Sequence, residues 1–370
     1  MKSESEKIEP LEESTNPQLT KDHELYREGE VTLTRVSGFS TEVVELLDST
    51  TWGTADTLYE HKKTDERIKD LTDPIPIELR VGDKLAALVV LDGRPVINKG
   101  FICNSYFFRY LASDVNFRGR KVVGKFGRIC MDTIRDGEQG KAIYFNSVEA
   151  KNYRSFNFVR KVGYEPIARI KTSGFSRFFT SGDKRVKRLP GERQSEMTDL
   201  LKQMYSGHSL VHFSNIYKND GYFVFEEDGE IIAGVQAHPA TWVVKKLGSK
   251  REQVLLKVVP HIPVLRKVFN PKKFEFLAFE GIYYHEGRER ALLRLFESVL
   301  HHYKRHSALF WLDENCPYYQ NILEHGRLGI LQNFVKGSDT WFMASSRNLS
   351  AEEEEMVTSG PAYVSAFDFI

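Results

Sequence analysis

The spacing of apolar and polar residues predicts alternating strands and helices along most of the chain. Residues 31–36 alternate as expected for a half-buried strand, and residues 85–91 form an apolar run. Asp92-Gly93 follows that run and precedes a second apolar stretch. Because Asp-Gly accepts the positive φ angles of a type I′ turn, this pattern predicts a β-hairpin. Two antiparallel strands are therefore expected before residue 110.

The most informative pattern lies in residues 110–164. It predicts an apolar strand, a basic turn containing Gly119, an amphipathic helix, a second strand, and a short helix that ends at Gly163-Tyr164. This order places a helix N-terminus just beyond the end of a strand. Free backbone N–H groups and the helix dipole favour an anion at such a place, so a phosphate-bearing ligand is predicted there.

A similar order of elements returns in the second half of the chain. Asp228-Gly229 again separates two apolar stretches, and residues 289–302 form an amphipathic pattern between two further predicted strands. The sequence AIYFNSVEAKNY from Ala142 aligns with ALFWLDENCPYY from Ala308, and Gly163 aligns with Gly329 at the same offset of 166 residues. A repeat of this size indicates two duplicated domains.

Two motifs resemble those of the GNAT acyltransferase family. Residues 114–123, DVNFRGRKVV, resemble its acetyl-CoA loop, and residues 152–164, which begin at Asn152 and end at Gly163-Tyr164, resemble its second signature. The resemblance spans most of residues 31–172 and, more weakly, 220–344. It implies an α+β (mixed α/β) fold of two tandem GNAT-like acyl-CoA N-acyltransferase domains, each with a mixed, mostly antiparallel sheet flanked by helices.

The same resemblance implies which residues bind acetyl-CoA, the expected co-substrate. Backbone N–H groups of the loop would hold the pyrophosphate, which agrees with the predicted anion site. The second domain carries Glu286 and Glu289 at this position, where they would repel a diphosphate, so the first domain is expected to bind CoA. The expected cofactor-binding residues are Val115, Arg118, Gly119, Arg120, Lys121, Val122, Val123, Gly124 and Asn152.

Direct acyl transfer requires that the acceptor amine lose a proton near the thioester. Asp114 and Glu149 are the candidate catalytic carboxylates in the first domain, and Glu280 is their counterpart in the second. The expected acceptor is an amine of a small molecule or a peptide. In proteins of this kind the acceptor site is shaped by variable segments, which correspond here to residues 52–69 and 241–273.

Shifts in composition predict the domain boundaries. Residues 1–29 are expected to form an acidic, flexible tail, and residues 181–194 a basic linker between domains at 30–180 and 195–347. The second domain contains a basic insertion at 241–273 with nine Lys or Arg residues against one Glu. Residues 348–370 are expected to form a C-terminal tail with a solvated acidic run.

Net charge and cysteine usage limit the remaining possibilities. The net charge of +1 gives no general argument for nucleic acid or membrane binding, and no apolar run approaches the length of a membrane span. Cys103, Cys130 and Cys316 are scattered, which favours a reducing, cytoplasmic location. No metal is expected, because His302 and His306 are four residues apart without a nearby carboxylate.

The sequence therefore predicts an acyl-CoA-dependent N-acyltransferase that transfers its acyl group directly to an amine. Two alternatives stay open at this point. The chain could be a catalytically inactive GNAT-fold protein that binds acyl-CoA or acts as a scaffold. It could also transfer an aminoacyl group from a charged RNA bound through the basic insertion.

Overall fold

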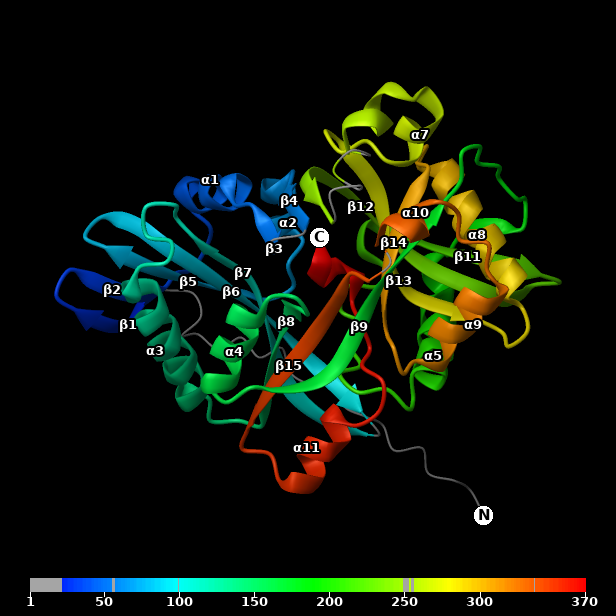
Figure 1. Ribbon diagram of the computed structural model, residues 1–370. Coiled ribbons are helices and arrows are strands. Elements are labelled where there is room, and N and C mark those ends of the chain that lie inside the picture. Colours follow the sequence, from blue (N-terminus) through cyan, green and yellow to red (C-terminus); the bar gives the residue numbers. More distant parts are fainter. Residues whose placement is uncertain (1–21, 55–56, 99, 249–252, 254–255, 336) are drawn as a thin grey trace, which may run out of the picture.

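The computed structural model describes the chain except for residues 1–21, 55–56, 99, 249–252, 254–255 and 336 (Figure 1). The first half folds into strands and helices close to the predicted ones. Its elements are β1 (His23–Glu28), β2 (Val31–Arg35), α1 (Thr41–Ser49), β3 (Trp52–Thr54), β4 (Thr57–His61), α2 (Thr64–Lys69), β5 (Pro74–Val81), β6 (Lys84–Asn98), β7 (Phe101–Ser113), α3 (Lys121–Gly137), β8 (Ala142–Glu149), α4 (Tyr153–Lys161) and β9 (Glu165–Ser176).

The second half repeats this order with an excursion between two of its strands. Its elements are β10 (Val186–Arg188), η2 (Gly191–Arg193), α5 (Gln194–Met204), η3 (Lys218–Asp220), β11 (Tyr222–Glu227), β12 (Glu230–Leu247), η4 (Val259–His261), α7 (Pro263–Val268), β13 (Phe274–Tyr284), α8 (Glu289–His302), β14 (Ser307–Asp313), α9 (Pro317–His325), α10 (Leu331–Val335), β15 (Asp339–Arg347), α11 (Ala351–Thr358) and η5 (Ala366–Phe369). None of the helices in the described part of the chain is long and apolar enough to cross a membrane.

All the strands belong to one 15-stranded sheet that runs through both lobes. Its main path is β1-β2-β5-β6-β7-β8-β15-β9-β14-β13-β12-β11-β10. The lobes share strands, because β15 from the end of the chain lies between β8 and β9, while β9 also pairs with β14. Figure 1 shows β9 and β15 crossing the centre of the molecule between the two lobes. The predicted domain boundaries stay a prediction.

Each lobe contains one parallel strand pair within an otherwise antiparallel sheet. In the first lobe, residues 104–108 of β7 pair with residues 142–146 of β8. In the second lobe, residues 277–279 of β13 pair with residues 308–310 of β14. The other named strand pairs in the described chain are antiparallel, as predicted for a mostly antiparallel sheet.

Apolar helix faces form the layers that cover this sheet. In the second lobe, α8 buries its apolar stripe against the sheet, and each such side chain contributes roughly 1.5–3 kcal/mol of hydrophobic stabilisation. In the first lobe, Phe126 and Cys130 of α3 pack with Val159 of α4 on the face formed by β5 to β8. The predicted stripe of α8 is confirmed by the burial of Ala291, Leu292, Leu295, Phe296, Val299 and Leu300.

The hairpin turn predicted at Asp92-Gly93 is wrong. β6 passes through both residues, and the turn that joins β5 to β6 lies at residues 82–83, where Gly82 has a φ of +58°. Asp92 is fully buried, and a Cβ on Gly93 would lie 3.0 Å from Asp73 Oδ2. This Asp-Gly pair therefore serves close packing and not a turn, whereas Asp228-Gly229 does form the predicted turn between β11 and β12.

Both chain ends differ from the predicted tails. Residues 23–28 form β1, which pairs with β2, so regular structure begins earlier than residue 31; residues 1–21 lie outside the described part. β10 lies within the predicted linker and pairs with β11. Glu352 to Glu355 are solvated on α11, but the segment after it is buried between the lobes, where Figure 1 places the C-terminus. Its buried members are Ala362, Tyr363, Val364, Ser365, Ala366, Phe367, Asp368 and Ile370.

Two arginines of the first lobe hold this C-terminal segment, defined as residues 361–370. Arg94 donates from Nη1 and Nη2 to the two carboxylate oxygens of Asp368 at 2.9 and 2.5 Å. Arg109 donates to the backbone oxygens of Phe367 and Ile370 at 3.3 and 3.0 Å. The Arg94 guanidinium also lies 3.5 Å from Asp92, and all three side chains are buried. The segment is thus fixed to β6 and β7 by buried charge.

Replacing Arg94 by methionine is expected to destabilise the protein strongly. R94M leaves the carboxylates of Asp92 and Asp368 buried without their shared cation, and such a loss costs about 3–5 kcal/mol. Urea unfolding at neutral pH measures this change. The exposed pair of Arg27 and Glu24 supplies the control, because R27M removes only a solvent-screened contact and should leave the urea midpoint nearly unchanged. Equal effects of the two substitutions would contradict a central role for Arg94.

Candidate active site

The predicted CoA loop lies where the parallel strands of the first lobe separate. β7 and β8 pair only over residues 104–108 and 142–146, although β7 continues to Ser113 and β8 to Glu149. The turn at 114–120 then leads from β7 into α3, whose N-cap is Arg120. No side chain among the described residues caps this N-terminus, and its first turn contains no acidic residue. Backbone N–H groups of the first turn therefore suit an anion.

Basic side chains surround this helix start. Arg118, Arg120 and Lys121 are exposed, and none of them forms an ion pair with another described residue. Arg120 instead lies over the ring of Phe117, 5.3 Å from its centroid. Lys125, one turn further along α3, is paired with Glu28 of β1. Three of the basic side chains are therefore available to a phosphate group.

The backbone of the loop leaves open space around it. Gly119 has a φ of +77°, which favours glycine, and an added Cβ there or at Gly124 would meet no atom within 4 Å. Val122 and Val123 are half-buried and pack against the core of the first lobe, whereas Lys121 is exposed. The predicted residues Val115, Arg118, Gly119, Arg120, Lys121, Val122, Val123 and Gly124 thus form one continuous turn and helix start.

The structure assigns distinct surroundings to Asp114, Glu149 and Asn152. Asp114 closes its own turn, because its Oδ1 accepts from the backbone N–H of Asn116 at 2.8 Å. Asn152 is the N-cap of α4 and accepts from the backbone N–H of Ser155 at 3.1 Å. Glu149 lies at the end of β8, where burial raises its pKa although hydrogen bonds from Thr54 act in the opposite direction. Burial therefore favours proton uptake by Glu149.

A β-bulge interrupts β7 just before the loop. The pairing with β6 passes from Arg109 to Ala112 and skips Tyr110 and Leu111, and Tyr110 has a φ of +53°. In the second lobe β13 repeats this feature, because its pairing with β12 skips Gly281, which has a φ of +55°, and Ile282. A bulge re-aims backbone groups away from the ladder. Both lobes thus carry the bulge beside the point where their parallel strands separate.

A cavity lies between the lobes and beside the bulge residue Tyr110. It draws its lining from both segments that were predicted to shape the acceptor site. The hairpin β3–β4 forms one side of it and pairs with β12 of the second lobe. We refer to this space as the interlobe cavity. It is lined by His61, Lys62, Thr64, Arg67, Tyr110, Ala240, Thr241, Trp242 and Ile370.

His61 is the most distinctive side chain of the interlobe cavity. Its ring stacks on Trp242, with centroids 5.5 Å apart and an interplanar angle of 3°, and also lies 5.5 Å from Tyr59. Its Nε2 is buried without a hydrogen-bond partner among the described residues. Burial and the positive charges of Arg109 and Arg67 lower the pKa of His61 to about 3. This imidazole is therefore neutral at physiological pH and can hydrogen-bond a ligand.

The corresponding space in the second lobe is filled by the C-terminal segment. Asp313 at the end of β14 accepts from the backbone N–H of Ala362 at 2.8 Å. Glu280 of β13 accepts from Ser365 Oγ at 2.8 Å and from the backbone N–H of Phe367 at 3.2 Å. The segment therefore bridges the two strands where they separate. The C-terminal segment also contacts β7 of the first lobe through Arg109, but the turn before α3 and the start of α3 are mostly exposed.

Glu280, the predicted carboxylate of the second lobe, has a structural role in these contacts. Besides the C-terminal segment it contacts His238, whose Nε2 lies 3.2 Å from Oε2. Burial opposes ionisation of Glu280, but the hydrogen bonds from His238, Ser365 and Phe367 hold its pKa below the ordinary value. Glu280 itself is only 1% exposed. Glu280 therefore anchors the C-terminal segment to β13.

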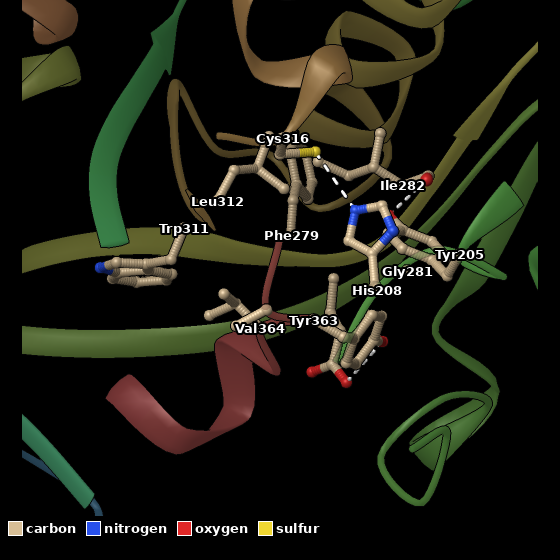
Figure 2. Close-up of a pocket in the computed structure, with 12 residues that line it drawn as sticks. Tyr205, His208, Phe279, Gly281, Ile282, Trp311, Leu312, Cys316, Tyr363 and Val364 are labelled. Carbon is tan, nitrogen blue, oxygen red and sulfur yellow. Dashed lines mark hydrogen bonds between the residues drawn. The ribbon is translucent and has the colours of Figure 1, made fainter. Parts of the chain in front are cut away.

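A small cavity remains beside the C-terminal segment, and Figure 2 shows Tyr363 and Val364 at its edge. His208 and Cys316 lie on its other side, with Nε2 and Sγ 3.5 Å apart. Burial raises the pKa of Cys316 to about 11 and lowers that of His208 to about 4. Both groups are therefore neutral at physiological pH, and this pair lacks the thiolate that a nucleophilic cysteine requires.

Sequence reasoning did not identify the interlobe cavity residues, although it did identify the two segments that supply most of them. His61, Arg67 and Tyr110 belong to no motif, and only the pairing of β4 with β12 brings them near Trp242. The available signal for this site was a set of aromatic rings within one predicted variable segment, namely Trp52, Tyr59 and His61. Periodicity alone could not show which partner strand that segment would find.

Comparison with solved structures identifies the fold. Saccharomyces cerevisiae N-myristoyltransferase with bound myristoyl-CoA is similar to this chain, with a TM-score of 0.57 and 11% identity over 94% of this chain and 92% of the yeast chain. A second yeast N-myristoyltransferase structure gives a TM-score of 0.58 and 11% identity over 94% and 88% of the two chains. The predicted fold of two tandem GNAT-like lobes is confirmed. Neither family models nor curated protein sequences match this chain.

Acid is expected to destabilise the protein through its buried histidines. His208 and His212 are at most 5% exposed, and burial lowers the pKa of both, to about 4 for His208. The unfolded chain binds their protons near pH 6.5, so their contribution to stability is full above that pH and is lost as the pH falls toward the folded-state pKa. Between pH 7 and pH 5 protonation of His208 should lower the free energy of unfolding by about 2 kcal/mol, and His212 should act in the same direction.

Urea unfolding of matched variants checks this pH dependence. H208Q removes one titrating group, so its loss of stability between the two pH values should be about 2 kcal/mol smaller than that of the unmodified protein. H23Q is the control, because His23 is exposed on β1, and its pH dependence should equal that of the unmodified protein. An unchanged acid response in H208Q would show that His208 is not held neutral.

Proposed function

We propose that this protein is an acyl-CoA-dependent N-acyltransferase whose first lobe binds CoA and whose interlobe cavity receives the acceptor amine. One observation carries the proposal. The start of α3, with three cations that form no ion pair within the described part of the chain, and the interlobe cavity flank the same separated strand pair. The similar yeast N-myristoyltransferase structure contains bound myristoyl-CoA. The acyl group is therefore tested with both acetyl-CoA, which the sequence resemblance implies, and a long-chain acyl-CoA.

The loop supplies electrostatic recognition of the CoA pyrophosphate. Backbone N–H groups at the start of α3 donate to phosphate oxygens, and the helix dipole adds partial positive charge. Arg118, Arg120 and Lys121 add three full charges at the same end. Charge-assisted hydrogen bonds of this kind are roughly twice as strong as neutral ones. The second lobe offers no such site, because Glu289 lies in the first turn of α8 and Arg288 is paired with Glu227.

The bulge and Glu149 supply the chemistry of transfer. The lone pair of the acceptor amine attacks the thioester carbonyl carbon, the C–S bond breaks, and the CoA thiolate leaves with the bonding electrons. Backbone N–H groups of Tyr110 and Leu111, which the ladder with β6 skips, stabilise the oxyanion that forms at the carbonyl oxygen. Glu149 accepts the proton of the amine, because burial raises its pKa toward the range of a general base.

The interlobe cavity orients the acceptor. Glu149 acts electrostatically on Tyr59, and Tyr59 stacks on both His61 and Trp242, so the base and the cavity lie at the same aromatic cluster. Nε2 of His61 has no hydrogen-bond partner among the described residues. It can form a hydrogen bond to the acceptor substrate beside the amine that reacts. The proposed acceptor is an amine of a small molecule or a peptide, as the sequence predicted.

Calorimetric titration with acetyl-CoA and with myristoyl-CoA tests the cofactor site. One of the two should give a saturable heat, and the double variant R118E/K121E should lower that affinity by about 100-fold, because two charge-assisted phosphate contacts become repulsive. K202E, an exposed lysine of α5 in the second lobe, is the matched control and should bind normally. No heat from either thioester would sink the proposal.

Measurement of the thiol released from acyl-CoA, in a mixture of short peptides with free α-amines, tests the base. E149Q should lower kcat by about 100-fold or more while acyl-CoA affinity stays unchanged. D114N is the competing variant, because Asp114 is the other predicted carboxylate. A large loss in D114N with full activity in E149Q would move the base to Asp114. Tight acyl-CoA binding with no thiol release under any condition would favour the non-catalytic alternative.

A further inference from the structure

The basic insertion forms a separate protrusion at the edge of the second lobe. It leaves the sheet after β12 at Leu247 and returns at Phe274 with β13, and its described residues include η4 and α7. Figure 1 shows α7 at the top of the view, beyond the upper ends of the strands of the second lobe. Residues 249–252 and 254–255 lie outside the described part. The insertion is unrelated to the CoA loop, which lies in the first lobe.

The inner side of this protrusion is anchored to the protein. Val259 of η4 and Val268 of α7 are each 1% exposed and belong to the main hydrophobic core. Leu256 and Leu265 pack against the same core from its edge. These contacts hold the protrusion in a fixed orientation on the second lobe.

Three other apolar side chains of the protrusion are exposed and do not belong to the hydrophobic core. Val258, Ile262 and Val264 are 44%, 39% and 45% exposed. They lie within seven consecutive residues, whereas the other exposed large apolar side chains in the described chain are spread over six other places. Single exposed apolar residues are ordinary, but a cluster on a projecting element indicates an interaction surface.

Cations are interleaved with these apolar side chains. Lys257, Arg266 and Lys267 are exposed, and none of them forms an ion pair with another described residue. Lys267 Nζ lies 5.7 Å from the ring centroid of Phe179, which is itself 79% exposed. The whole insertion contains nine basic residues and one acidic residue, in a chain whose net charge is only +1. Positive charge is therefore concentrated on this protrusion.

We propose that this protrusion docks onto the surface of an anionic lipid membrane. Its docking surface consists of Phe179, Lys257, Val258, Ile262, Val264, Arg266 and Lys267, which we call the α7 surface. Aliphatic side chains insert into the boundary between headgroups and acyl chains, while lysine and arginine attract acidic headgroups. Neither contribution suffices alone, and the α7 surface supplies both.

Nucleic acid fits the α7 surface less well than lipid does. A phosphate backbone would engage Lys257, Arg266 and Lys267, but it would leave Val258, Ile262 and Val264 without a partner. Single-stranded nucleic acid is bound by aromatic stacking, and Phe179 is the one aromatic residue of this surface. The aliphatic cluster therefore decides in favour of the membrane.

Sedimentation of the full-length protein with vesicles tests the proposal. Vesicles of phosphatidylcholine and phosphatidylserine in about a two-to-one ratio should bind the protein, vesicles of phosphatidylcholine alone should bind it far more weakly, and added salt should weaken binding. K257E/R266E/K267E should lower the affinity by about 100-fold or more, since each basic residue near the surface contributes roughly a factor of five. V258S/I262S/V264S should lower it by about tenfold or more.

Matched variants elsewhere on the protein control for surface composition and folding. I97S/I102S removes two exposed apolar side chains at the β6–β7 turn, and K202E reverses an exposed charge on α5; both should bind vesicles normally. Thermal unfolding of each variant shows that it is folded. Equal binding to neutral and anionic vesicles, or full binding by both triple variants, would overturn the proposal. Binding to a single-stranded RNA that the charge reversals abolish, without vesicle binding, would assign the surface to nucleic acid instead.

Discussion

The ion pair between Arg94 and Asp368 joins the first half of the chain to its last residues inside the protein. Arg94 contacts both carboxylate oxygens of Asp368 at 2.9 and 2.5 Å, and its Nη1 also lies 3.5 Å from Asp92 Oδ2. Burying a charge costs free energy unless an opposite charge pairs with it. The folded state is therefore favoured only when Arg94 and Asp368 are in contact. The position of the C-terminal segment, and with it the shape of the space between the lobes, therefore depends on a charge on β6.

The C-terminal segment makes two lobes of one fold chemically different. In the second lobe it bridges Asp313 and Glu280 across the separated strands β13 and β14, and it leaves only a small cavity beside His208 and Cys316. In the first lobe the separated strands lead to an exposed, basic helix start. The two lobes share this strand geometry, but the C-terminal segment bridges the separated strands of the second lobe and leaves the start of α3 in the first lobe exposed.

The interlobe cavity arises from the same exchange of segments. β4 of the first lobe pairs with β12 of the second, which stacks His61 on Trp242, and Ile370 closes the cavity from the C-terminal side. Three stretches that are far apart in the sequence thus meet beside the bulge at Tyr110. A ligand at this place would contact residues of both lobes.

The sequence by itself determined the local features whose causes are local. The apolar stripe of α8, the basic turn before α3 and the Asp228-Gly229 turn follow from periodicity, helix-terminus charge and φ preference, and the 166-residue repeat identified two related lobes. Tertiary structure decided what depends on long-range partners. Asp92-Gly93 lies inside β6, Glu280 anchors the C-terminal segment, and His61 is neutral between arginines. Burial and pairing set the roles of such residues, and neither is encoded in the spacing of the residues around them.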